Sequence, residues 1–268
     1  MKTMIIHFAS ALGILLSMLF SGSSDNKFIK SIRRYTNAET NKEVIFVPLE
    51  HLGTEAQYKR VKDCLDSLKH NGYVTFYEGL LPIPINSTSS EINSIDLIAT
   101  IESYIQTDYD SLYIDTLLRK ARAIIECNAF GGYNEPDNNS LPKSIQRMSN
   151  SGKYVEQDIE NLGLTTEKDI WCDYSLDKLI ELYEQDYGKI NLMPYDFQTP
   201  LNSPYDSPHT RSEWAFTHKY RESLIIERIL KSQHQKIVVV YGAGHIGMLT
   251  LDLKSFHGYE KDKKFKIK

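Results

Sequence analysis

The feature that most constrains this fold is a strand, a helix and a second strand within 34 residues, positions 44–77. Residues 44–47 are a short apolar run, which predicts a buried strand. Thr54 and Gln57 have the spacing of a helix capping box, and Asn71-Gly72 is typical of a helix end. Residues 73–77 are β-branched or aromatic, which favours a strand. This βαβ pattern predicts two parallel strands and an α/β fold.

The rest of the chain extends this pattern. Apolar residues at helical spacing predict helices near residues 114–125, 175–188 and 211–233, and residues 236–241 read as a buried strand. Four prolines within residues 193–210 predict irregular structure, and residues 265–267 are a candidate edge strand. We therefore expect a central mixed, partly parallel sheet flanked by helices, with a helical insertion at about residues 90–210.

Composition limits the function classes. The chain has 268 residues, of which 41% are hydrophobic, so it can bury a core and is not a disordered chain. Its 31 basic and 35 acidic residues give a net charge of −4, which excludes a strongly basic protein. We therefore expect no nucleic-acid partner.

The N-terminus has the pattern of a secretory signal. Residues 3–24 carry no charged side chain, Lys2 precedes them, and small residues follow the apolar run. We predict a signal peptide over residues 1–23, a polar lead-in over 24–43 and a single domain over 44–268. The protein would then be exported to the periplasm or cell envelope. An uncleaved membrane anchor and a buried core helix are the alternatives, and the anchor would be the chain's only membrane contact.

Three polar residues follow predicted strands. His51 comes four residues after the first strand, Glu78 directly after the second, and His245 four residues after strand 236–241. Ligands of open α/β sheets bind beyond the carboxyl ends of the strands. If these strands are neighbours, the three side chains converge, and two imidazoles with a carboxylate can ligate a metal or form an acid/base set. Each residue alone is more often a structural or surface group.

Residues 242–247 also fit the dinucleotide fingerprint G-x-G-x-x-G. A dinucleotide fold needs an acidic residue about 20 positions later and several more βα units. Only 21 residues follow Gly247, and they end in Lys-Lys-Phe-Lys-Ile-Lys. We therefore expect these glycines to present His245 at a crowded strand end.

The C-terminal motif resembles a known family. Arg221, the helix after it and the strand ending in Gly242-x-x-His245 look like the C-terminal motif of the TraB/GumN/Tiki proteins. The N-terminal counterpart of that motif is Pro48-Leu49-Glu50-His51, with Glu78 as the acid, and Pro48 stands where the family has glycine. The resemblance covers roughly residues 44–80 and 210–250. It implies a fold similar to the erythromycin-esterase/ChaN-like superfamily.

The resemblance also implies an activity. Tiki members are divalent-metal-dependent peptidases, so His51, Glu78 and His245 would hold Mn, Co or Zn, and the substrate would carry a peptide or ester bond. Glu78 and Arg221 would take part in catalysis, with Arg221 neutralising an oxyanion or orienting Glu78. Glu50 is a candidate general base, and an exposed turn carboxylate is its alternative reading.

Two further alternatives stay open. The chain could be a non-catalytic envelope protein whose histidines hold haem or another small ligand, because fold kinship does not fix function. His218 lies three residues before Arg221 and hence on the same helix face. It could support the site through a hydrogen bond or be a plain surface histidine.

Overall fold

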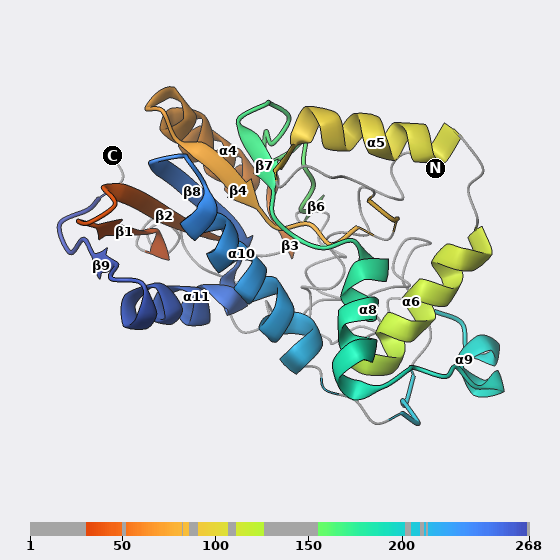
Figure 1. The fold of residues 1–268 in the computed structure, drawn as a ribbon. Coiled ribbons are helices and arrows are strands. Elements are labelled where there is room, and N and C mark those ends of the chain that lie inside the picture. Colours follow the sequence, from red (N-terminus) through yellow and green to blue (C-terminus); the bar gives the residue numbers. More distant parts are fainter. Residues whose placement is uncertain are drawn as a thin grey trace.

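The computed structural model describes residues 31–49, 52–81, 83–85, 91–106, 111–125, 155–201, 205–209, 212 and 214–266. Within these ranges the protein is an α/β fold with a seven-stranded mixed sheet in the order β5-β7-β4-β8-β2-β1-β9 (Figure 1). The predicted fold class is therefore confirmed.

The strands of the main sheet have the following bounds: β1 Arg33–Asn37, β2 Lys42–Leu49, β4 Val74–Tyr77, β5 Ile92–Asn93, β7 Asp169–Trp171, β8 Lys236–Gly242 and β9 Glu260–Lys261. A separate pair joins β3 (Leu52–Gly53) to β6 (Val155–Glu156). The helices are α4 Glu55–His70, α5 Ser94–Gln106, α6 Ser111–Ile125, α8 Leu176–Tyr187, α9 Pro194–Gln198, the π-helix η2 Ala215–Lys219, α10 Tyr220–Lys231 and α11 Ala243–Phe256.

The predicted βαβ unit consists of β2, α4 and β4. Thr54 caps α4 through a capping box with Gln57, as the spacing predicts. β8 lies between β2 and β4 and runs parallel to both, so the two strands share one direction without being neighbours. β8, which follows β2 and β4 in the sequence, therefore occupies the centre of the sheet.

Helices cover both faces of the sheet. Along β8, Val238 and Val240 pack in one apolar cluster with α4, α5, α6 and α8, while Val239 and Tyr241 pack in another with α10 and α11. Successive strand residues point to opposite faces, so a strand covered on both sides is apolar throughout. This burial explains the unbroken apolar run of β8.

The polar lead-in and the proline-rich segment both contain regular structure. The lead-in over residues 24–43 includes β1, which pairs with β2 through a turn and buries Tyr35. The proline-rich segment includes the short helix α9, which Pro194 opens at a first-turn position where it loses no helical hydrogen bond. The prediction of irregular structure across residues 193–210 was therefore wrong for residues 194–198.

The edge strands also differ from the prediction. The C-terminal edge strand is β9, which pairs with β1 five residues before the predicted 265–267. The predicted helical insertion contributes β5 and β7 to the sheet, and β7 pairs in parallel with β4. β7 has only three residues, all buried, so it lacks the length that marks a strand in sequence.

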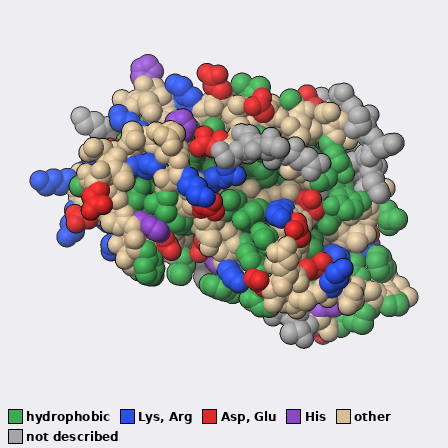
Figure 2. Space-filling view, in the orientation of Figure 1, with side chains coloured by type: hydrophobic (Ala, Val, Ile, Leu, Met, Phe, Trp, Pro, Cys, Tyr) green, Lys and Arg blue, Asp and Glu red, His purple; other side chains and the backbone are tan. Residues whose placement is uncertain are grey.

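Acidic and basic side chains are intermixed on the surface in the view of Figure 2. On α4 they form pairs one helical turn apart, Lys59 with Asp63 and Lys62 with Asp66. None of the helices in the described ranges combines the length and the hydrophobicity of a membrane span. The predicted signal peptide over residues 1–23 lies outside those ranges.

Candidate functional site

The candidate site lies where the central parallel strands end. Glu78 directly follows β4, Asp173 lies two residues after β7, and Gly242 ends β8. β8 pairs in parallel with β4, and β4 with β7, so all three positions meet at the carboxyl edge of the sheet. This is the edge at which open α/β sheets bind ligands.

A buried arginine joins two carboxylates at this edge. Arg221 of α10 donates from Nη2 to Glu78 Oε1 at 2.5 Å. It also bonds Asp173 twice, from Nε at 2.9 Å and from Nη2 at 2.6 Å. All three side chains are at most 5% exposed. Burial lowers the pKa of Arg221, but the charges of Asp173 and Glu78 outweigh burial and raise its pKa well above the ordinary value.

The two carboxylates also hold the backbone of the strand ends. Glu78 Oε2 accepts a hydrogen bond from the Gly242 N–H at 2.5 Å. Asp173 Oδ2 accepts one from the Gly79 N–H at 3.1 Å. Each carboxylate therefore connects the guanidinium to a different strand end, and the cluster fixes the geometry of the whole edge.

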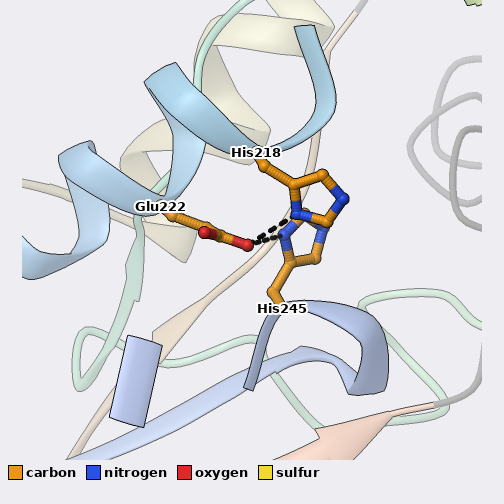
Figure 3. A group of neighbouring side chains, drawn as sticks. All are labelled: His218, Glu222 and His245. Atoms are coloured by element: carbon orange, nitrogen blue, oxygen red, sulfur yellow. Dashed lines mark hydrogen bonds and ion pairs between the residues drawn. The ribbon is translucent and has the colours of Figure 1, made fainter. Parts of the chain in front are cut away.

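A second cluster lies beside the first and consists of two histidines and a glutamate (Figure 3). Glu222 Oε1 is 2.7 Å from His218 Nδ1 and 3.0 Å from His245 Nδ1. One ligand atom from each residue lies within 4.8 Å of the other two. Burial raises the pKa of Glu222, but hydrogen bonds from His218 and then His245 outweigh burial, so its pKa is lowered and the carboxylate stays ionised.

Three elements position this cluster. His218 lies in η2 and Glu222 one turn later in α10, so they share one helix face. His245 lies in the first turn of α11, directly after β8. The Tyr241 ring packs at right angles to the His245 ring with centroids 5.1 Å apart, which limits how that imidazole can rotate. Single π-helical turns within α-helices are frequent at functional sites, and η2 is such a turn.

His245 connects the two clusters. Its Nδ1 faces Glu222, and its Nε2 lies 3.8 Å from Glu78 Oε1. The side chain of His245 is 6% exposed, whereas those of Glu222 and His218 are 12% and 17% exposed. The His218 side of the cluster is therefore the side that solvent can reach.

The second cluster fits a divalent metal ion. Imidazole nitrogens and a carboxylate oxygen are ligands of Zn²⁺ and of other first-row metals such as Mn²⁺ and Co²⁺. A set of two histidines and one glutamate is typical of catalytic zinc sites, which keep one position for water or substrate. Among the residues that the structure describes, this is the group of three that could hold a metal.

The structure brings together three of the five predicted site residues. His245, Glu78 and Arg221 meet at the carboxyl edge, with the distances given above. Glu50 and His51 lie outside the described residues. Leu49, the residue before them, pairs with Gly242, so β2 ends at the same edge as β8.

Sequence reasoning missed two members of the site. Asp173 follows β7, and because that strand was not predicted, its strand-end acid could not be recognised. Glu222 lies next to Arg221 and four residues after His218, and a histidine and a glutamate at that spacing share a helix face. The spacing between His218 and Glu222 was therefore the signal in the sequence. It went unused because His218 was considered without Glu222.

We compared the chain with protein-family models, curated proteins and solved structures, and none of them matches it. The resemblance to the TraB/GumN/Tiki proteins therefore stays a prediction.

Proposed function

We propose that this protein is an exported, divalent-metal-dependent hydrolase of peptide or ester bonds, with the metal on His218, Glu222 and His245. The observation that carries this proposal is the convergence of two imidazoles on one carboxylate oxygen, at 2.7 and 3.0 Å. The proposal keeps His245 from the sequence prediction. It gives Glu78 a positioning role, because Arg221 and the Gly242 N–H already engage both of its oxygens.

Glu78 would act through His245. Histidines that bind metals donate their other ring N–H toward a carboxylate or carbonyl, which fixes the tautomer and the ring orientation. The 3.8 Å between His245 Nε2 and Glu78 Oε1 exceeds a hydrogen bond but keeps the negative charge beside that nitrogen. Arg221 in turn fixes Glu78, so a buried network orients the imidazole.

The chemistry follows from the ligand set. His218, Glu222 and His245 would hold the metal, which would supply Lewis acidity toward a substrate carbonyl and a water of pKa lowered toward about 7. Glu222 and His218 are the more exposed ligands, so substrate would approach from their side. Arg221 is 3% exposed and bonded to two carboxylates, which supports a positioning role over direct contact with substrate.

Metal titration tests the proposal. The purified protein is titrated with Zn²⁺, Mn²⁺ and Co²⁺ by calorimetry, and bound metal is measured by mass spectrometry. We expect one equivalent in the wild type and at least about tenfold weaker binding in His218→Ala, Glu222→Gln and His245→Ala. His234→Ala is the matched control, because His234 is 39% exposed and pairs only loosely with Glu91 at 3.6 Å.

Two outcomes would contradict the proposal. One is equal metal binding by the wild type and by a triple His218→Ala, Glu222→Gln, His245→Ala variant. The other is a metal-loaded wild type that cleaves no member of a mixed library of peptides and esters. A haem titration that gives a Soret band dependent on the same histidines would instead favour the ligand-binding alternative.

Export has its own test. Sequencing the N-terminus of the mature protein from fractionated cells should find a start near residue 24, as the signal pattern predicts. A start at Met1 in a membrane fraction would favour the anchor alternative, and a start at Met1 in the cytosolic fraction would contradict export.

A further inference from the structure

A small cavity lies beside Glu78. It has a volume of about 30 Å³. Glu78, Tyr77 and Gly79 line it from the end of β4 and Trp171 from the end of β7. Apolar side chains make up most of the remaining wall: Leu81, Leu97, Ile101, Ile159, Leu162 and Leu164. Such a wall favours an apolar occupant, because apolar surfaces bind polar groups poorly.

One polar atom in this wall has no partner. Gln157 Oε1 is buried and accepts no hydrogen bond within the part of the chain that the structure describes. Three neighbouring polar groups in the wall have partners: the Tyr77 hydroxyl accepts a hydrogen bond from Ser94, Trp171 Nε1 donates to the Gly79 carbonyl at 2.5 Å, and Asp158 Oδ1 accepts a hydrogen bond from the Asn161 N–H at 2.6 Å. A buried acceptor without a donor costs free energy, which an occupant with an N–H would recover.

Size narrows the occupant further. A site for one water needs roughly 10–15 Å³, so this cavity admits a few atoms but no aromatic ring. An aliphatic branch of one to three carbons fits these limits. A peptide residue provides such a branch next to a backbone N–H, which could donate to Gln157 Oε1.

We propose that this cavity binds a short aliphatic side chain of a peptide, of alanine to valine size, whose backbone N–H donates to Gln157. This inference rests on the proposed function and names the substrate class of the same site. Glu78 links the two, because it lines the cavity and its carboxylate is 3.8 Å from His245 Nε2.

Tryptophan fluorescence tests the cavity without any hydrolysis. The chain has two tryptophans, and Trp214 is 57% exposed while Trp171 lines the cavity. In a Trp214→Phe variant, N-acetyl-L-valine N-methylamide should change the emission of Trp171 with saturation. The glycine and phenylalanine analogues should bind at least about tenfold more weakly, since one leaves the cavity empty and the other does not fit.

Substitutions in the Trp214→Phe background test whether the probe binds in the cavity. Leu97→Phe should fill the cavity and abolish binding of the valine probe, and Gln157→Leu should weaken it by about tenfold. Leu112→Phe on α6 is the matched control, because Leu112 is 69% exposed. If Leu97→Phe does not fold, Ile101→Ala decides, because the enlarged cavity should then prefer the phenylalanine analogue.

The outcomes separate this inference from the proposed function. Absence of saturation with the valine probe, or equal binding by the Trp214→Phe protein with and without Leu97→Phe, overturns the cavity proposal even if the protein is an active metallohydrolase. Saturable, size-selective binding in a protein that takes up no metal supports the cavity and overturns the hydrolase.

Discussion

Two buried arginines in this protein bond to different kinds of partner. Arg221, at 3% exposure, pairs with the carboxylates of Glu78 and Asp173. Arg122 of α6 is fully buried and donates to the backbone carbonyls of Pro200, Asp196 and Thr199. Their pKa values move in opposite directions: that of Arg221 is raised by its carboxylates, whereas burial and then Arg119 lower that of Arg122.

The carboxylate next to each arginine shows the same contrast. Glu78 bonds groups from α10 and β8 and also faces His245. Asp196 bonds groups close to it in sequence: the Tyr205 hydroxyl, His209 Nε2 at 2.9 Å and the Met193 N–H at 2.6 Å. Partners close in sequence fix the path of one segment, whereas partners from distant elements fix the shape of a site.

The two clusters differ in the side chains that lie next to them. Both contain a buried arginine, a buried carboxylate, a tyrosine and a histidine. Only the Arg221 cluster adjoins a partly exposed set of metal-type ligands, His218 and Glu222. The Arg122 cluster instead holds the proline-rich segment after α9 against α6 through its carbonyls. We therefore expect changes at Arg221 to affect metal binding and changes at Arg122 to affect stability alone.

Replacing Arg221 with methionine should have the largest effect. Arg221→Met leaves Glu78 and Asp173 buried without their cation, which costs about 3–5 kcal/mol of unfolding free energy. Chemical denaturation measures the loss, and metal titration of the folded fraction should show weaker binding. Lys231→Met on the same helix is the control, because Lys231 is 76% exposed and should change stability by no more than about 0.5 kcal/mol. Equal stability of both variants would contradict the assigned role of Arg221.

Replacing Arg122 with methionine should have the second-largest effect. Arg122→Met leaves carbonyls of Pro200 and Thr199 without this donor, at a cost of about 1–3 kcal/mol. The loss is smaller than at Arg221 because Arg122 donates to carbonyls, so no carboxylate loses a hydrogen-bonded cation. Metal affinity should stay within twofold of wild type. A variant that loses metal along with stability would show that the two clusters are coupled and would break the comparison.

Acid should weaken the Arg122 region through Asp196. Burial raises the pKa of Asp196, but hydrogen bonds from Tyr205, the Met193 N–H and His209 outweigh burial and lower the pKa. The folded pKa therefore lies below that of the unfolded chain, about 3.9. The stabilisation by ionised Asp196 is present above that unfolded value and is lost as the pH falls through the lower folded pKa.

Denaturation curves between pH 7 and pH 2.5 measure this effect. Asp196→Asn should be less stable than wild type near neutral pH, and the difference should shrink as the pH falls through the folded pKa. A difference that stays constant over the whole range would contradict the role of the ionised carboxylate.

The parts of the fold with local signals could be predicted from sequence. The Thr54–Gln57 capping box and the apolar run of β8 depend on neighbours in the chain, and both were found. β7 depends on burial between β4 and β5, which no local pattern in three residues reveals. α9 was not predicted because four prolines lie within residues 193–210. Pro194, however, occupies a first-turn position that helices tolerate.

The site residues divide in the same way, into those with a local sequence signal and those without one. Glu78 and His245 were found because residues after parallel strands converge, and Arg221 came from the family resemblance. Asp173 and Glu222 were missed because their importance depends on which elements face each other: β7 beside β4, and α10 beside α11. The role of Glu78 changed for the same reason, since Arg221 and Gly242 already engage its oxygens.

The smallest expected changes in stability concern the tyrosine of each cluster. The Tyr205 hydroxyl donates to Asp196, whereas the Tyr241 hydroxyl is buried without a hydrogen-bond partner in the described part of the chain. Tyr205→Phe should therefore cost about 1 kcal/mol, because Asp196 keeps its other donors. Tyr241→Phe should change stability by less than about 0.5 kcal/mol or raise it slightly, because an unpaired hydroxyl is removed and the ring still packs on His245. Denaturant melts of both variants at pH 7 measure the pair. A loss at Tyr241 as large as that at Tyr205 would mean that the hydroxyl at the strand edge has a partner that stabilises the folded protein.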